Sequence, residues 1–258
     1  HRVLWTFALL AVYLFCSRRW RWIQKAITDR RTVAVFLMSS VLITANWSTY
    51  TYAIVTNQTL EASLGYFMNP LVSVLLGTVF LKEKLNKAQM LAIVFACAGV
   101  MWVTFKQGEF PALWPYAGAQ LLDFYGLVRK MAPLGSLEGL TLETAFAFPV
   151  ALLATFYFAG NGDLTFVHGT SWDKFWLIMA GPITTIPLIL FAYGLKQVPY
   201  STVGFIQYLS PTMVFFIGLF FFGEELQVDR LIGFILIWAG VLIFVGENFF
   251  PQPFRISY

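Results

Sequence analysis

The stretch NPLVSVLLGTVFLKEKLNKAQMLAIVFACAGV, residues 69–100, decides the fold because its pattern returns 141 residues later as SPTMVFFIGLFFFGEELQVDRLIGFILIWAGV, residues 210–241. Pro70 matches Pro211, and Ala98-Gly99-Val100 matches Ala239-Gly240-Val241. The offset crosses an odd number of predicted membrane helices, so the second copy is expected to be inverted. Many secondary transporters use inverted repeats to build a site that faces each side of the membrane in turn. The repeat therefore predicts a transporter.

Composition predicts the class independently of the repeat. Of 258 residues, 59% are apolar and only 12% are charged, far from an average soluble domain. A helix needs about 20 mostly apolar residues to cross the hydrocarbon core. We therefore expect an all-α polytopic membrane protein with nine helical segments: Val3–Cys16, Thr32–Val55, Thr59–Phe80, Ala88–Phe105, Pro111–Val128, Leu137–Ala159, Trp172–Leu195, Ser201–Phe222 and Leu231–Phe250.

The repeat also predicts the domain organisation. A shift of 141 residues pairs 3–16 with 144–157 and 32–55 with 173–196, but leaves Pro111–Val128 without a partner. We expect inverted five-helix repeats from a parent of ten helices, with nine present here and the first helix missing. The first repeat, lacking that helix, would cover residues 1–105, and the second, inverted repeat would cover residues 106–258.

The distribution of basic residues predicts the orientation, because Lys and Arg concentrate in cytoplasmic loops. Thirteen basic residues fall on the side of the Arg18–Arg31 loop and the C-terminus, including Arg129 and Lys130, against four on the other side. We therefore expect the C-terminus to be cytoplasmic. The net charge of +4 then follows from topology, and no nucleic-acid partner is implied.

Enzymatic and metal chemistry are not expected. The sequence contains no Gly-rich phosphate loop, nucleophile elbow or paired metal motif. Cys16 and Cys97 lie in separate apolar segments, without the spacing of metal ligands, and His168 stands alone in a loop. The sequence thus predicts a protein that is not an enzyme and that needs no cofactor.

Ionisable residues inside membrane helices are costly and are functional hypotheses by default. The 141-residue offset places Arg2 and Glu143 at equivalent points of the two repeats. Glu61 opens its segment on the same side as Arg2, so we expect these two to pair, either functionally or as a structural or interfacial ion pair. Proton coupling through Glu61 or Glu143 is a further hypothesis, because a poorly solvated carboxyl can cycle near neutral pH.

Matched proline interruptions in the two copies point to a central binding site, with pure helix packing as the alternative. An amide such as Asn46 must find a partner inside lipid, which is either a substrate or a neighbouring helix. The predicted substrate-binding residues are Arg2, Asn46, Trp47, Glu61, Tyr66, Asn69, Tyr125, Glu143, Gln207 and Tyr208, and helix breaks are predicted at Pro70, Pro187 and Pro211.

Several strings together identify a family resemblance. Asn46-Trp47, Glu61-Ala62-Ser63-Leu64-Gly65-Tyr66-Phe67, Tyr125–Lys130, Leu142-Glu143-Thr144 and Gln207-Tyr208 resemble the RarD branch of the EamA transporters, in the drug/metabolite transporter superfamily. The resemblance implies ten helices in two inverted halves, a multi-pass position in the bacterial inner membrane, and a permease role linked by name to chloramphenicol sensitivity. It implies no particular substrate.

Asp123 departs from the pattern expected of such relatives. It is a local peculiarity, a sign of a shortened helix, or a functional carboxylate. The expected function is a secondary transporter that moves a small metabolite or amphipathic drug-like molecule by alternating access. A non-transporting membrane assembly or scaffold subunit is the alternative.

Overall fold

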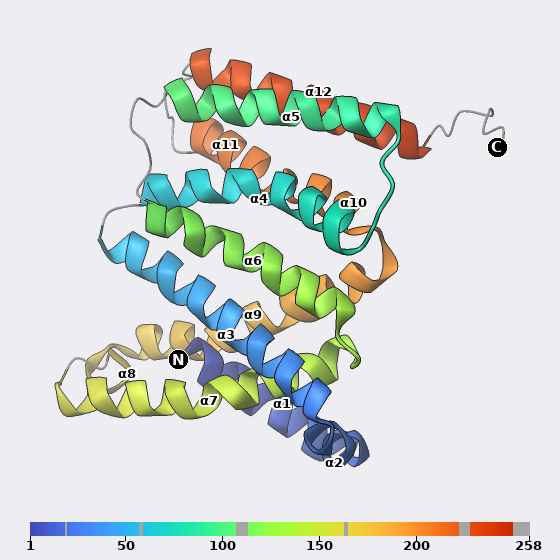
Figure 1. Cartoon of the computed structure of the whole chain (residues 1–258). Helices are drawn as coiled ribbons and strands as arrows, with labels where there is room; N and C mark the ends of the chain where they lie inside the picture. Colours follow the sequence, from blue (N-terminus) through green and yellow to red (C-terminus); the bar gives the residue numbers. More distant parts are fainter. Residues whose placement is uncertain (19, 57–58, 107–112, 163–164, 222–227, 250–258) are drawn as a thin grey trace. The chain divides into compact units, whose positions relative to one another are not determined.

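A computed structural model of the chain describes residues 1–18, 20–56, 59–106, 113–162, 165–221 and 228–249 (Figure 1). Helices account for nearly all of these ranges, and no β-strand occurs within them. The helices are α1 (Arg2–Ser17), α2 (Arg21–Thr28), α3 (Arg30–Val55), α4 (Thr59–Phe80), α5 (Lys87–Lys106), α6 (Leu113–Met131), α7 (Ser136–Gly160), α8 (Thr165–His168), α9 (Ser171–Gln197), α10 (Tyr200–Gln207), α11 (Leu209–Phe221) and α12 (Val228–Phe249).

The expected all-α polytopic membrane fold is confirmed. Within the described ranges, α3, α5, α7 and α9 are each long and apolar enough to cross a membrane, and shorter apolar helices cover 2–17, 66–80 and 231–247. The sequence did not predict α2, which lies in the Arg-rich loop. Its apolar face contributes Ala26 and Trp22 to a cluster around Phe36 and Leu142. The helix was missed because its few apolar residues alternate with many Arg and Lys residues, a composition that indicates a loop.

Asp29 starts α3 by capping its first turn. Its carboxylate accepts the backbone N–H groups of Arg31 and Thr32, both at 3.2 Å, and the Thr32 hydroxyl at 2.5 Å. The hydrogen bond from the Thr32 side chain is the main cause that lowers the pKa of Asp29. A lowered pKa means that this cap stabilises α3 above the ordinary pKa of an aspartate and is lost as the pH falls.

The chain forms two compact units. The first contains His1–Ala45 and Val128–Gln197, and the second contains Asn46–Leu127 and Val198–Tyr258. The divisions fall inside α3 and α6. Each unit therefore combines helices from early and late in the sequence, and the two units are not the two predicted repeats. The repeat boundaries stay a prediction.

In the first unit, α1 packs on both α7 and α9. The α1–α9 contact is close because Gly181 lacks a side chain: a Cβ there would lie 2.7 Å from Trp5 Cβ. The hydroxyl of the buried Thr6 donates to the Gly181 carbonyl at 3.4 Å. On the α7 side, the rings of Phe7 and Phe148 lie 4.7 Å apart. These contacts hold helices that are far apart in sequence.

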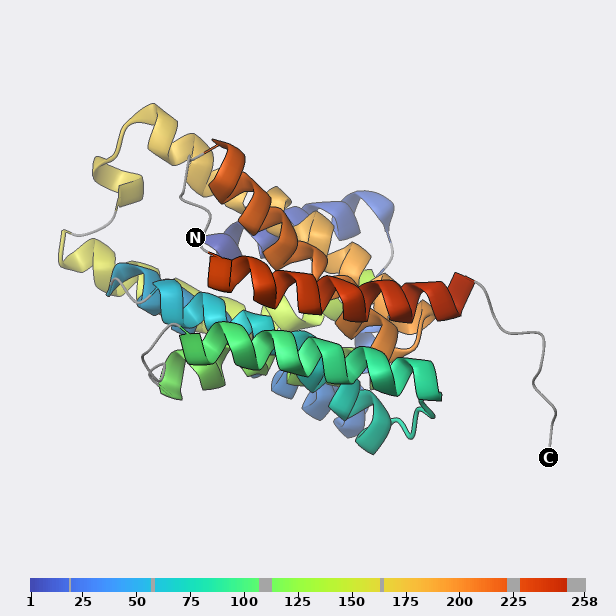
Figure 2. The same ribbon diagram turned by 90° about the horizontal axis from the view of Figure 1, so that it is seen from above.

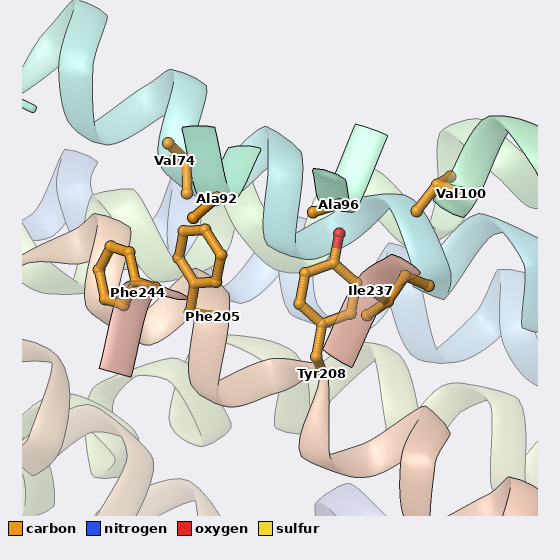
Figure 3. Packing of buried hydrophobic residues seen from close by; sticks show 8 residues of the cluster. All are labelled: Val74, Ala92, Ala96, Val100, Phe205, Tyr208, Ile237 and Phe244. Atoms are coloured by element: carbon orange, nitrogen blue, oxygen red, sulfur yellow. The ribbon is translucent and has the colours of Figure 1, made fainter. Parts of the chain in front are cut away.

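The second unit is built around an apolar cluster of α4, α5, α10 and α12 side chains (Figure 3). The rings of Phe205 and Phe244 stack with centroids 3.9 Å apart. Tyr208, which follows α10 directly, lies in the same cluster with its hydroxyl toward Ala96, while Ala92 lies by the Phe205 ring. Packing of this kind substitutes for hydrophobic driving force between helices in lipid.

Helices α5 and α12 lie side by side and run antiparallel (Figures 1 and 2). A Cβ on Gly99 would meet the Gly233 carbonyl oxygen at 2.6 Å, and a Cβ on Gly240 would meet the Ala92 carbonyl oxygen at 2.6 Å. Under the 141-residue offset, Gly99 corresponds to Gly240 and Ala92 to Gly233. The two contacts are therefore each other's equivalents.

Replacing Gly240 by Ala is expected to destabilise the protein by about 1–2 kcal/mol, because the new methyl group meets a backbone oxygen that cannot move without shifting a helix. Thermal unfolding in detergent measures the loss. Gly246→Ala, on the same helix, is the matched control, since nothing lies within 4 Å of a Cβ at that position. Equal effects of the two substitutions would contradict the close-packing argument.

The prolines have unequal consequences for the backbone. α10 ends and α11 begins around Tyr208, three residues before Pro211, whose missing N–H cannot bond the carbonyl four residues earlier. Helices α4 and α9, in contrast, continue without interruption through Pro70 and Pro187. The sequence predicted a break at all three prolines. Neighbouring helices can satisfy a freed carbonyl inside a membrane, so a proline alone does not fix a break.

Candidate functional site

Most predicted site residues fall in the second unit: Asn46, Trp47, Glu61, Tyr66, Asn69, Tyr125, Gln207 and Tyr208. Arg2 and Glu143 belong to the first unit. Glu61 lies in α4, but its side chain is outside the described residues, so the predicted pairing of Arg2 with Glu61 is untested.

Asn46 links three helices of the second unit. Its side chain is only 2% exposed, and Nδ2 lies 2.8 Å from the Gly118 carbonyl oxygen of α6 and 3.1 Å from the Tyr66 hydroxyl of α4. Close approach at Gly118 is required, because a Cβ there would overlap Thr49. The Tyr66 ring also meets the edge of Tyr50, with centroids 5.5 Å apart. Asn46 thus has helix partners in this state.

One turn further along α4, a second polar row faces α6. Asn69 Nδ2 donates to the Ala119 carbonyl at 3.4 Å, and the Ser73 hydroxyl donates to Asp123 Oδ1 at 2.5 Å. The Tyr200 hydroxyl of α10 donates to the backbone carbonyl of Asp123 at 2.6 Å. All of these side chains are buried. We call Asn69, Ser73, Asp123 and Tyr200 the α4–α6 polar cluster.

The cluster contains acceptors that the described part of the chain leaves unsatisfied. Asp123 Oδ2 and Asn69 Oδ1 are buried and have no hydrogen-bond partner there. Buried polar atoms are nearly always paired, so each exception calls for an explanation. In an apolar helix bundle, unpaired acceptors of this kind mark a place that a ligand or proton can occupy.

The other predicted residues of the second unit differ in exposure. Tyr125 is fully buried, and Trp47 and Gln207 are half-buried. Tyr208 is 2% exposed, and its hydroxyl has no hydrogen-bond partner among the described residues. It lies in the apolar cluster of Figure 3, so its place in this state is a packing position.

The first unit contains a buried ion pair. Arg129 Nε lies 3.4 Å from Glu143 Oε1, with both side chains 1% exposed. The Ser39 hydroxyl donates to the same Glu143 oxygen, and the Ser40 hydroxyl donates to the Glu143 backbone carbonyl at 2.8 Å. Arg129 was counted from sequence among the basic loop residues. It lies instead in the last turn of α6, and its guanidinium is buried in the unit; the side of the membrane predicted for it stays a prediction.

Arg129 is held on several sides. Its Nη2 donates to the Ser136 carbonyl at 2.9 Å, and its guanidinium lies 5.5 Å from the centre of the Phe36 ring, a cation–π contact. A Cβ at Gly139 would overlap Nη1 and would lie 2.6 Å from Phe36 Cε1. Gly139 therefore provides the space in which the guanidinium lies. Arg2, by comparison, is exposed at the start of α1.

Glu83 anchors the start of α10. Its two carboxylate oxygens accept the backbone N–H groups of Tyr200 at 2.5 Å and Ser201 at 2.9 Å. A carboxylate at a helix N-terminus satisfies otherwise unpaired donors and is favoured by the helix dipole. This contact fixes α10, and with it Tyr200, against the end of α4.

Replacing Glu83 by Gln is expected to lower the free energy of unfolding by about 1 kcal/mol, because one charge-assisted bond is lost and the amide brings a donor toward another donor. Chemical or thermal unfolding in detergent measures the change. Lys84→Gln removes a charge from an exposed neighbour and is the control. If the Glu83→Gln variant were as stable as the unsubstituted protein, water would be able to replace the carboxylate without a loss of free energy.

Sequence reasoning missed Ser73, Tyr200, Arg129, Ser39 and Ser40, and left Asp123 open. A usable signal existed for Ser73: it follows Asn69 by four residues, so both lie on one face of α4. The position of Tyr200 next to Asp123 depends on tertiary packing, and no local pattern shows it.

The long apolar helices, with buried polar groups between them, define the class as an all-helical integral membrane protein. The EamA-like transporter family matches residues 1–105 and 124–246. The chain belongs to this family and, within it, to the RarD branch, as the sequence strings indicated. It is therefore a membrane transporter.

Relatives cover nearly the whole chain. It is 34% identical to "Protein RarD" of Escherichia coli over 98% of this chain and 85% of that protein. It is 40% identical to "Uncharacterized transporter YojE" of Bacillus subtilis, over 95% of this chain and 82% of that protein. A crystal structure of a protein with 16% sequence identity matches the fold with a TM-score of 0.65, covering 94% of this chain and 86% of the other. The names agree with the expectation that the chain is not an enzyme.

Proposed function

We propose that this protein is a secondary transporter that moves a small metabolite or amphipathic drug-like molecule across the bacterial inner membrane by alternating access. The observation that carries the proposal is the α4–α6 polar cluster, which lies inside otherwise apolar helices of a chain from a transporter family. Polar groups inside membrane helices are costly and mark substrate or ion pathways. The C-terminus is cytoplasmic in this proposal, following the basic loops.

The antiparallel pairing of α5 with α12 supports the two inverted repeats in this proposal. If the repeats are inverted, helices that correspond under the 141-residue offset run in opposite directions and contact each other reciprocally. The Gly99–Gly233 and Gly240–Ala92 contacts have this reciprocity. In the second unit, Ser201 lies near Gly77 and Gly204 near Pro70, so α10 also runs opposite to α4.

The proposed binding residues follow from what each can offer a ligand. Asn46, Asn69 and Gln207 can orient polar groups, and Trp47, Tyr66 and Tyr125 offer aromatic faces. The Asn46–Tyr66 bond occupies groups that a substrate would recruit, so binding exchanges a helix contact for a ligand contact. Tyr208 stays a proposed contributor through its buried hydroxyl, which has no hydrogen-bond partner among the described residues.

Glu143 keeps a proposed role in the site. Its contacts favour a carboxylate that stays charged over one that binds and releases a proton during transport. Arg129 and two serine hydroxyls surround it, and breaking a buried pair is expensive. Arg2 and Glu61 stay proposed contributors to the site. In the predicted topology they lie near the membrane face opposite to that of Glu143. Substitution of Glu61 by Gln with unchanged transport would remove Glu61 from the site.

Reconstitution of the full-length protein tests the proposal. Candidate metabolites are first screened for thermal stabilisation, because a ligand that binds only the folded state raises its stability. Any that bind are then loaded into proteoliposomes, and the expected result is saturable exchange that Asn46→Ala and Asn69→Ala reduce at least tenfold. Lys84→Gln is the control. Binding without flux would favour a non-transporting scaffold instead.

A further inference from the structure

We infer that the α4–α6 polar cluster is a proton-binding site in which Asp123 Oδ2 carries the proton that couples transport. This inference rests on the proposed transport function and gives its coupling a definite place. The two hypothetical coupling groups named from sequence, Glu61 and Glu143, are elsewhere in the chain. Among the described residues of the second unit, Asp123 is a fully buried carboxyl, with 0% exposure.

The hydrogen bonds around Asp123 pair one carboxylate oxygen and leave the other unpaired among the described residues. Oδ1 accepts the Ser73 hydroxyl at 2.5 Å, and Oδ2 has no partner among the described residues. A carboxylate can only accept hydrogen bonds, whereas a carboxylic acid also donates one. A proton on Oδ2 removes the negative charge from this buried, unpaired oxygen and leaves Oδ1 free to accept from Ser73.

The electrostatic surroundings also favour the neutral acid. The elements packed against this part of α6 contribute Ser73 and Asn69 from α4 and the phenol of Tyr200 from α10. Within the described ranges no Lys, Arg or His lies within ion-pair distance of Asp123; the described ion pairs are Lys106–Asp229 and Arg129–Glu143. An unpaired buried carboxylate is very costly, and such groups neutralise by binding a proton.

A metal cation fits the cluster less well. Hard cations such as Ca²⁺ and Mg²⁺ take about six or more oxygen ligands. Here only two side-chain oxygens of the cluster are uncommitted, Asp123 Oδ2 and Asn69 Oδ1. The Ser73 hydroxyl and the Ala119 carbonyl already take part in hydrogen bonds. One proton, in contrast, neutralises the carboxylate without needing a set of ligands.

Infrared difference spectroscopy of the purified full-length protein tests the inference directly. The expected result is a C=O stretching band of a protonated carboxylic acid that shifts on exchange into deuterium oxide and is absent from Asp123→Asn. Asp229→Asn, which removes a half-exposed carboxylate of α12, should leave the band unchanged. Asn at position 123 can accept from Ser73 and donate as the acid does, so we expect that variant to fold.

Ser73→Ala provides a second readout. It removes the donor to Oδ1 and should move the band to higher frequency without abolishing it. Absence of the band in the parent protein, or its persistence in Asp123→Asn, would overturn the inference. So would a thermal stability that rises in sodium chloride relative to choline chloride and loses that rise in Asp123→Asn, since sodium would then be the ligand. The band does not depend on flux, so a failure of transport alone is distinguishable.

Discussion

Arg129→Met is expected to lower the free energy of unfolding by about 3–5 kcal/mol, the largest effect we predict for a single substitution. Methionine fills a similar volume but removes the guanidinium that faces the buried Glu143 carboxylate. Glu143 and Arg129 are both 1% exposed, so water cannot replace the lost contact. Unfolding of the purified variant in detergent, or a loss of monodisperse protein on solubilisation, measures the effect.

The double substitution Arg129→Met with Glu143→Leu is the control that separates pairing from packing. Removing both charges of a buried pair is often neutral or stabilising, because neither partner is left uncompensated. The double variant is therefore expected to be more stable than Arg129→Met alone. If the two losses simply added, the ion pair would contribute nothing specific, and the destabilisation would come from poor packing around Phe36 and Ser136.

Gly139→Ala is the second large effect, at about 2–3 kcal/mol. The added methyl group overlaps Arg129 Nη1 and approaches Phe36 Cε1 to 2.6 Å. A guanidinium usually swings away from such a clash, but here the Ser136 carbonyl and Glu143 hold it. Relief of the clash therefore requires the guanidinium to move away from Glu143, which weakens the ion pair. Thermal unfolding measures the loss.

Two comparisons make the Gly139 prediction specific. Gly160→Ala lies on the same helix, where nothing is within 4 Å of a Cβ, and it should be close to neutral. In the background of Arg129→Met with Glu143→Leu, the cost of Gly139→Ala should fall by about 1 kcal/mol or more, because residues in contact are coupled energetically. An unchanged cost in that background would assign the clash to Phe36 alone.

Much of the fold was predictable from the sequence. The nine predicted apolar segments correspond to α1, α3, α4, α5, α6, α7, α9, α10 with α11, and α12. A helix that crosses lipid needs about 20 mostly apolar residues, and such a run is easily recognised in a sequence. Helix α2 was missed since its apolar face is interleaved with arginines. The breaks predicted at Pro70 and Pro187 do not interrupt their helices, because neighbouring helices decide whether a proline kinks, bends or is accommodated.

The contacts of the candidate site were less predictable. Asn46, Asn69 and Glu143 stood out as polar residues in apolar segments, and that signal is local. Their partners Gly118, Ala119 and Arg129 depend on which helices meet, and a sequence pattern contains no such information. Arg129 shows the limit clearly: the sequence indicated only its place among the basic residues of one side, whereas its side chain is buried at the end of α6.

The tie between Glu83 and the start of α10 joins residues 118 positions apart. At a synthesis rate of about 5–20 residues per second, the carboxylate exists for on the order of ten seconds before its partner is made. During that interval the nascent chain holds an acid and glycine-lined helix faces that only later segments can cover. The start of α10 can therefore be anchored only late in synthesis, after most of the chain has been made.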